Sequence, residues 1–225
     1  MHIPESRQPQ PESFPVLIFD FDGTIGNSNA VYDDFAGEVL RSHGIPHDPA
    51  YTEELKTMTI GDSCISLSAK LSGSLTAEEI RRDLEAYVLA FYANEVEPMP
   101  GAMEYLARVE ELGRRRALVT ATPLHLIRPA LARLGLQDYF EAVVTPEMAG
   151  DRDKSFPDIY EKALALIGGP SPSDCCVFDD APAAIRTASG LGIYTVGLWD
   201  PISPGQEEIM RPLCSLFIRD FRDLL

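Results

Sequence analysis

The hydrophobic pattern begins with one buried strand and continues into a long helical stretch. Residues 16–19 form an unbroken apolar run, which is typical of a strand covered on both faces of a parallel sheet. Residues 27–97 carry helical rather than strand periodicity, with apolar positions recurring at helical spacing over 29–43 and 76–94. We therefore expect an all-helical insertion directly after the first strand.

From residue 101 onward, helical patterns alternate with short apolar or β-branched runs. The pattern predicts helices at 101–112, 123–134, 156–167 and 182–189, and strands at 117–120, 142–144, 176–178, 193–196 and 216–218. Strict alternation of this kind is typical of a parallel sheet with helices on both faces. The predicted fold class is α/β, with a Rossmann-like doubly wound parallel sheet core and an inserted all-helical domain.

Composition shifts set the expected domain boundaries. Residues 1–14 are polar and rich in proline, and we expect a disordered N-terminal lead there. Residues 15–26 and 98–225 are assigned to the core domain, and residues 27–97 to the helical domain. The prolines near position 98 suit a linker at the return to the core.

Length and charge restrict the possible partners. The chain has 225 residues, of which 45% are hydrophobic, so it can bury a full core and carry a sizeable insertion. A net charge of −16 argues against nucleic acid or a membrane surface as a partner, because both attract Lys and Arg. Any phosphate group must therefore be neutralised locally, by a divalent cation and a few placed basic residues.

The cysteines and the N-terminal segment indicate the compartment. The four cysteines form no C-x-x-C pair, and Cys175 and Cys176 lie in an apolar run, so we expect reduced core thiols. No signal-peptide core and no apolar run of membrane-spanning length is present. These features predict a cytoplasmic protein; oligomeric state is left open.

Polar residues follow the ends of four predicted strands: Asp20 and Asp22, then Thr120, then Lys154, then Asp179 and Asp180. Asp20 and Asp22 would point the same way if the strand continued, but Gly23 interrupts it. Parallel strands place such residues at one sheet edge, where α/β proteins bind ligands. Carboxylates with a lysine and a threonine suit Mg²⁺ and a phosphoryl group, so the pattern predicts a metal and phosphate site.

Over residues 16 to about 200, the chain resembles the haloacid dehalogenase-like (HAD) hydrolase superfamily, in its phosphoglycolate-phosphatase-like branch with a helical cap. The resemblance rests on four motifs in order: DxDGT at 20–24, Thr120 in LVTAT, Lys154 in DKSFPDIY, and Asp179 with Asp180 in FDDAPAAIRTASGLG. The third motif departs from the usual G-K-P-x-P-D, because Asp153 and Ser155 replace its glycine and first proline. The loop around Lys154 is therefore expected to differ in shape.

The resemblance implies a role for each motif residue. Asp20 would be the nucleophile that forms an aspartyl phosphate, and Asp22 would protonate the leaving group and then activate water. Lys154 would offset charge on Asp20 and phosphate, and Mg²⁺ would be held by Asp20, the backbone carbonyl of Asp22, and Asp180. Asp179 would either complete the metal shell or order a water. Phosphate would be bound by Gly23, Thr24, Thr120, Ala121 and Lys154.

The predicted function is a Mg²⁺-dependent phosphomonoester hydrolase, acting on a small phosphorylated metabolite such as a phosphoglycolate-like compound or a sugar phosphate. A carboxylate at Asp22 favours phosphate esters over haloacids or phosphonates as substrates. Two alternatives remain: a sugar phosphomutase of the same branch, and a non-catalytic HAD-like binding module. The mutase is disfavoured because such enzymes have a histidine near the place of Tyr32. Phosphoacceptor receiver domains are rejected, because there the lysine comes last in the chain.

Overall fold

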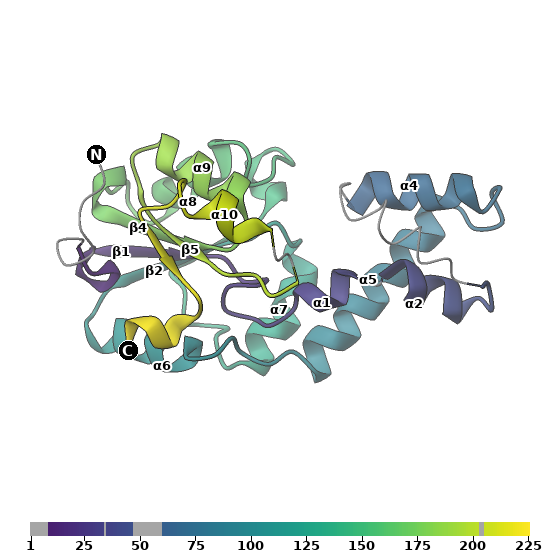
Figure 1. Ribbon diagram of the computed structural model, residues 1–225, viewed down its shortest axis with the longest axis horizontal. Coiled ribbons are helices and arrows are strands. Elements are labelled where there is room, and N and C mark those ends of the chain that lie inside the picture. Colours follow the sequence, from purple (N-terminus) through teal and green to yellow (C-terminus); the bar gives the residue numbers. More distant parts are fainter. Residues whose placement is uncertain (1–8, 34, 47–59, 203–204) are drawn as a thin grey trace. The chain divides into compact units, whose positions relative to one another are not determined.

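The computed structural model describes residues 9–33, 35–46, 60–202 and 205–225. The chain divides into two compact units. The first joins the described residues up to Asn27 with Glu97–Leu225, and the second is Ser28–Val96. Figure 1 shows the sheet of the first unit and the helices of both.

The core of the first unit is a six-stranded, fully parallel sheet in the order β3-β2-β1-β4-β5-β6. Its strands are β1 (Val16–Phe19), β2 (Arg115–Val119), β3 (Ala142–Val144), β4 (Cys175–Asp179), β5 (Tyr194–Leu198) and β6 (Leu216–Ile218). The chain winds outward from β1 to β3 and then returns to β4 on the other side of β1. The predicted fold class is therefore confirmed, and the order reverses beside β1, where such sheets bind ligands.

Helices connect the strands of the sheet. They are α6 (Ala102–Glu111), α7 (Leu124–Arg133), α8 (Asp158–Leu166), α9 (Pro182–Gly190) and α10 (Gln206–Met210). Short 3₁₀ helices are η2 (Pro11–Ser13), η3 (Pro146–Ala149), η4 (Pro172–Asp174) and η5 (Phe221–Leu224). Helix α8 packs against β2 and β3, and α9 packs against β4 and β5.

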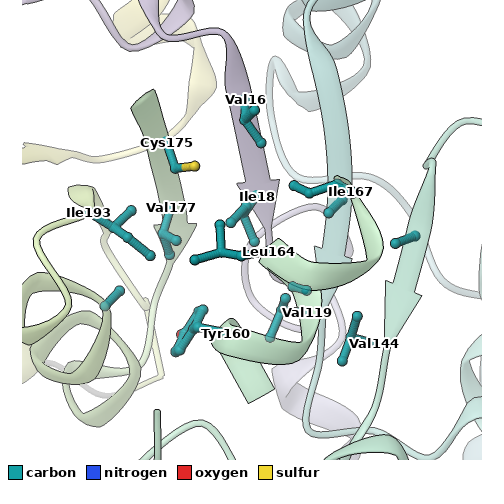
Figure 2. Packing of buried hydrophobic residues seen from close by; sticks show 14 of the residues in the cluster. Val16, Ile18, Val119, Val144, Tyr160, Leu164, Ile167, Cys175, Val177 and Ile193 are labelled. Atoms are coloured by element: carbon teal, nitrogen blue, oxygen red, sulfur yellow. The ribbon is translucent and has the colours of Figure 1, made fainter. Parts of the chain in front are cut away.

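Both faces of β1 are buried, which explains its continuous apolar run. Val16 and Ile18 belong to a cluster that includes Leu164 and Ile167 from the α8 region (Figure 2). The alternate residue Phe19 stacks on Phe178 of β4, with ring centroids 4.7 Å apart. Because successive side chains on a strand point to opposite faces, this strand leaves no position for a polar residue until it ends.

Aromatic residues fill the face of the sheet opposite α8. The Phe178 ring lies 5.5 Å from the ring of Tyr105 on α6 and 5.7 Å from that of Phe221 in η5. Gly101 starts α6 at this place, with a φ of 75°. A Cβ on Gly101 would lie 2.7 Å from the backbone nitrogen of Arg222, so glycine is needed both for the left-handed backbone and for this close approach.

The first described residues differ from the predicted disordered lead. Residues 1–8 lie outside the description, but Pro11–Ser13 form η2 and the side chain of Glu12 is buried. Glu12 pairs with Arg108 of α6 at 2.5 Å, and Arg108 also donates to the carbonyl of Leu224 at 3.1 Å. The composition of this segment did not indicate that one carboxylate would anchor it to the core.

The described part of the second unit is helical, comprising α1 (Asn29–Asp33), α2 (Phe35–Ser42), α4 (Ile60–Lys70) and α5 (Ala77–Asn94). Helices α1 and α2 lie within the helix expected at 29–43; residue 34 and the Tyr32 side chain lie outside the description. Helix α5 starts with the capping box of Thr76 and Glu79 and buries Ile80 and Leu84. None of the helices in the described ranges is both long enough and apolar enough to cross a bilayer.

Candidate active site

Asp20 is the first residue beyond β1, at the carboxyl edge of the sheet. Its backbone N–H donates to the carbonyl of Phe178 at 3.0 Å, which continues the pairing with β4 for one more residue. Thr120 occupies the same place after β2, where its N–H donates to the carbonyl of Val144 at 3.1 Å. These bonds fix both residues rigidly at the sheet edge, and both side chains are buried.

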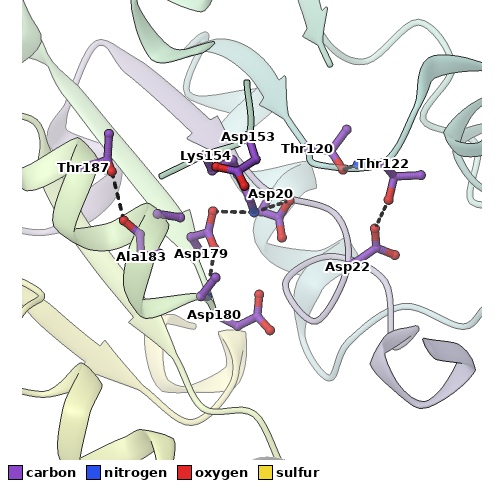
Figure 3. Close-up of polar contacts among 12 residues, drawn as sticks. Asp20, Asp22, Thr120, Thr122, Asp153, Lys154, Asp179, Asp180, Ala183 and Thr187 are labelled. Atoms are coloured by element: carbon purple, nitrogen blue, oxygen red, sulfur yellow. Dashed lines mark hydrogen bonds and ion pairs between the residues drawn. The ribbon is translucent and has the colours of Figure 1, made fainter. Parts of the chain in front are cut away.

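Lys154 lies between two of the predicted carboxylates, as Figure 3 shows. Its Nζ is 2.9 Å from Asp20 Oδ1 and 2.8 Å from Asp179 Oδ2. The residue precedes α8, and only 8% of its surface is exposed. The altered loop sequence around Lys154 thus still delivers the ammonium group to Asp20.

Asp179 and Asp180 come from the end of β4, next to β1. The second carboxylate oxygen of Asp179 accepts a hydrogen bond from the N–H of Ala181 at 2.9 Å. Both carboxylate oxygens of Asp179 therefore have partners: Lys154 donates to Oδ2, and Ala181 donates to Oδ1. The backbone carbonyl of Asp180 accepts from the side chain of Gln206, at the start of α10.

Three carboxylates converge at this edge in a way that fits a divalent cation. One oxygen each from Asp20, Asp179 and Asp180 lie within 4.8 Å of one another, and all three residues are buried. With Lys154 protonated and all three acids ionised, the group carries a net charge of −2. Hard oxygen donors with this excess charge match the ligand preference of Mg²⁺.

The ionisation of the pair follows from burial and from these charges. Burial raises the pKa of the Asp20 carboxyl well above its usual range, Lys154 opposes this, and Asp179 adds to the increase. Burial alone would lower the pKa of the Lys154 ammonium, but Asp179 and Asp20 raise it well above its usual range. The lysine is therefore charged, and a further cation beside Asp20 would favour its ionised form.

Asp22 is directed away from Asp20 by a tight loop. The carbonyl of Phe21 accepts from the amides of Ile25 and Gly26 at 2.9 and 2.8 Å, and a Cβ on Gly26 would collide with the Phe21 ring. Within this loop the carboxylate of Asp22 accepts a hydrogen bond from Thr122 Oγ1 at 2.6 Å (Figure 3). The group of three converging carboxylates does not include Asp22; the predicted metal contact was through its backbone carbonyl.

The remaining predicted phosphate-binding residues lie in the same two loops. The amides of Gly23 and Thr24 donate to the carbonyls of Gly26 and Phe21 at 2.9 and 3.2 Å, so they close the loop after β1. The left-handed φ of 73° at Gly23 permits this turn. Ala121 is exposed beside Thr120. Contact of these residues with phosphate stays a prediction.

Two residues of the site were not singled out in the sequence. Thr122 is buried, and its N–H donates to Thr120 Oγ1 at 3.0 Å while its hydroxyl holds Asp22. The T-x-T spacing directly after a strand was the available signal for Thr122. Tyr160 of α8 is buried close enough to the ion pair to interact with its charges, and burial and the charge of Asp179 raise the pKa of its hydroxyl well above its usual range. No sequence motif marked Tyr160 as part of the site.

Comparison with known families decides the classification. Residues 14–192 match the family model described as haloacid dehalogenase-like hydrolase. The chain belongs to this family. The family and enzyme class predicted from the four motifs are thereby confirmed, since the match spans most of the chain.

Named relatives are similar over most of their length. Validoxylamine A 7'-phosphate phosphatase of Streptomyces hygroscopicus subsp. limoneus is 28% identical, over 82% of this chain and 85% of the relative. Fructose-1-phosphate phosphatase YqaB of Escherichia coli is also 28% identical, over 82% and 96%. The crystal structure of CbbY from Rhodobacter sphaeroides in complex with phosphate shares the fold, with a TM-score of 0.76 at 21% identity, over 94% and 96% of the two chains.

Proposed function

We propose that this HAD-like hydrolase is a Mg²⁺-dependent phosphatase of small phosphorylated metabolites, and that it works through an aspartyl phosphate on Asp20. The observation that carries the proposal is the position of Lys154, 2.9 Å from Asp20 Oδ1 and 2.8 Å from Asp179 Oδ2. A carboxylate attacks a phosphate dianion only when the negative charges of both are offset. Here a buried ammonium group stands directly beside the proposed nucleophile.

In the first step, an Asp20 oxygen forms a bond to phosphorus while the bond from phosphorus to the ester oxygen breaks. The electron pair of that bond goes to the leaving oxygen, which takes a proton from the carboxyl group of Asp22 and departs as an alcohol. In the second step, Asp22 accepts a proton from a water molecule that attacks phosphorus. The bond from phosphorus to Asp20 breaks, and inorganic phosphate and the Asp20 carboxylate are released.

The phosphoryl oxygens need hydrogen-bond donors that are in place before the reaction. Thr120 Oγ1 accepts from the N–H of Thr122, so its own proton can point toward a bound phosphoryl group. Lys154 supplies a second, charged donor beside Asp20. Asp179 holds the ammonium on the opposite side and thereby fixes its direction.

Asp20 and Asp180, with Asp179 adjacent, are the residues that would hold the metal. When bound, Mg²⁺ would offset the charge of these carboxylates and of the phosphate group. The raised pKa of Asp20 supports this requirement, because a neutral carboxyl group is a poor nucleophile.

The proposed substrate class is a small sugar phosphate or a phosphoglycolate-like monoester. The names of the two phosphatase relatives refer to single small phosphate esters. The net charge of −16 supports the same conclusion, because it repels polyanions such as a 5'-phosphorylated oligonucleotide.

The test is phosphate release from a panel of sugar phosphates, phosphoglycolate and a 5'-phosphorylated oligonucleotide, each with Mg²⁺ and with EDTA. The proposal expects Mg²⁺-dependent release from at least one small monoester and little from the oligonucleotide. Interconversion of a sugar phosphate without phosphate release would identify a mutase instead. Binding of the small esters without any turnover would identify a non-catalytic module.

A further inference from the structure

Thr122 connects two residues that the proposed reaction uses for different purposes. It lies two residues after Thr120 in the loop that leaves β2, and only 6% of its surface is exposed. Its backbone N–H donates to Thr120 Oγ1 at 3.0 Å, and its side-chain hydroxyl donates to Asp22 Oδ2 at 2.6 Å. One residue thus contacts both the hydroxyl proposed to bind phosphate and the carboxyl group proposed as the acid.

The contact to Asp22 spans 100 positions of the sequence and joins the loops after β1 and β2. Asp22 is half-buried, and its loop is held by the hydrogen bonds to the carbonyl of Phe21. A short carboxylate side chain has few rotamers, and a hydroxyl at 2.6 Å selects one of them. Because Oδ2 accepts the proton of Thr122, the proton that Asp22 transfers would be carried by Oδ1.

We propose that Thr122 is a positioning residue that holds Asp22 in the orientation for proton transfer to the leaving oxygen. This inference rests on the proposed phosphatase function. It concerns the orientation of the Asp22 carboxyl group, and it predicts that the loss of activity on removing the Thr122 hydroxyl depends on the leaving group. An alkoxide is a strong base and needs the proton as the ester bond breaks, whereas p-nitrophenolate departs without one.

The hydroxyl and the backbone amide of Thr122 can be separated by substitution. Thr122→Val keeps the shape of the side chain and the N–H that binds Thr120, and it removes the donor to Asp22. Thr122→Ser keeps the donor and is the rescue variant. Thr145→Val is the matched control, because Thr145 is also a buried threonine and lies directly after the neighbouring strand β3.

The measurement is kcat and KM for a sugar phosphate and for p-nitrophenyl phosphate, in wild type and the three variants, with Asp20→Asn in parallel. For Thr122→Val we expect kcat on the sugar phosphate to fall by about 10- to 100-fold, which is part of the usual general-acid contribution. We expect KM to stay similar and kcat/KM for p-nitrophenyl phosphate to fall by less than about threefold. The ratio kcat/KM reports the first step, which this substrate completes without the acid, and leaves out the later attack of water that both substrates share. Thr122→Ser and Thr145→Val should retain the wild-type ratio of the two kcat/KM values.

Four outcomes would overturn the inference. Equal losses of kcat/KM on both substrates would place the effect in phosphate binding or folding and not in proton transfer to the leaving oxygen, and a melting temperature for each variant separates these two. Unchanged turnover in Thr122→Val would mean that Asp22 is oriented without the threonine, and higher turnover would mean that the threonine holds Asp22 in an inactive orientation. Full activity of Asp20→Asn would refute the underlying phosphatase mechanism, a failure distinct from a failure of Thr122 alone.

Discussion

Lys154 Nζ lies 2.8 Å from Asp179 Oδ2, so Asp179 is a partner of the lysine as well as a member of the acidic group. The sequence left two roles open for Asp179, a metal ligand or the holder of a water. The structure adds a third role, that of holding the lysine. One oxygen of Asp179 accepts from the ammonium group, and the other accepts from the N–H of Ala181. This residue therefore links the end of β4 to the loop before α8.

Removing the lysine should destabilise the protein in a pH-dependent way. Lys154→Met leaves Asp20 and Asp179 buried without their cation, which should lower the free energy of unfolding by about 3–5 kcal/mol in EDTA at neutral pH. Because Lys154 lowers the pKa of Asp20, its loss raises that pKa further. A raised pKa in the folded state favours folding at low pH, and this contribution is lost as pH rises through the folded-state value.

Urea unfolding at several pH values checks this prediction. The loss in Lys154→Met should be smaller at pH 5 than at pH 8. Lys162→Met on the exposed side of α8 is the control and should change little at either pH. A loss in Lys154→Met that is independent of pH would contradict the assigned role of the carboxylates.

Mg²⁺ should stabilise the folded protein through the acidic group. A cation at 100 times its dissociation constant adds about 2.7 kcal/mol, and for a chain of this size each kcal/mol raises the melting temperature by roughly 2–4 °C. Asp180→Asn should abolish this shift. Because Asp180 contributes to the repulsion that raises the pKa of Asp20, the variant in EDTA should be no less stable than wild type.

Scanning calorimetry with and without Mg²⁺ measures these shifts. Asp174→Asn is the matched control, since Asp174 is exposed before β4 at the other end of the strand. A full Mg²⁺ shift in Asp180→Asn would place the metal elsewhere in the chain.

The cysteines should differ in their reactivity in the native protein. Cys64, Cys175 and Cys176 are buried, whereas Cys214 is partly exposed. Burial raises the pKa of Cys175 to about 11 and that of Cys214 above its ordinary value, so little thiolate is present at neutral pH. Iodoacetamide should therefore modify Cys214 first, and faster at pH 9 than at pH 7. Peptide mass spectrometry that finds Cys175 or Cys176 modified as quickly would contradict this order.

Gly101→Ala should cost more stability than a left-handed backbone alone explains. A left-handed alanine costs about 1–2 kcal/mol, and at Gly101 the added Cβ would also meet the backbone of Arg222. Gly113 has a similar φ of 64° with nothing within 4 Å of the added atom, so Gly113→Ala isolates the backbone cost. Chemical denaturation measures the free energy of unfolding of both variants. Equal losses of stability would show that the backbone at the start of α6 shifts to accommodate the added Cβ at little cost.

The sequence predicted the parts of the fold that depend on periodicity. The apolar run of β1 and the alternation after residue 101 predicted the parallel sheet, and the capping box at Thr76 marked the start of α5. The anchoring of Glu12 by Arg108 was not predictable in this way. That pair joins residues 96 positions apart, and no local pattern carries such information.

The candidate site was predictable as a set of residues, and its internal contacts were not. Asp20, Lys154 and Asp179 follow strand ends, and parallel strands bring such ends together. The direction of Asp22 depends on how the loop after β1 closes around the Phe21 carbonyl. The T-x-T spacing after β2 could have singled out Thr122, but its contact with Asp22 depends on that loop.

If Asp20 is the nucleophile of a phosphatase, phosphate release must depend on it, and the activity of Asp20→Asn tests this. The assay uses the best small monoester at saturating Mg²⁺, with Asp138→Asn as the control because Asp138 is exposed after α7. We predict that Asp20→Asn loses about a thousandfold or more in kcat, since the covalent route is removed, while Asp138→Asn keeps wild-type turnover. Turnover by Asp20→Asn within about tenfold of wild type would contradict the account.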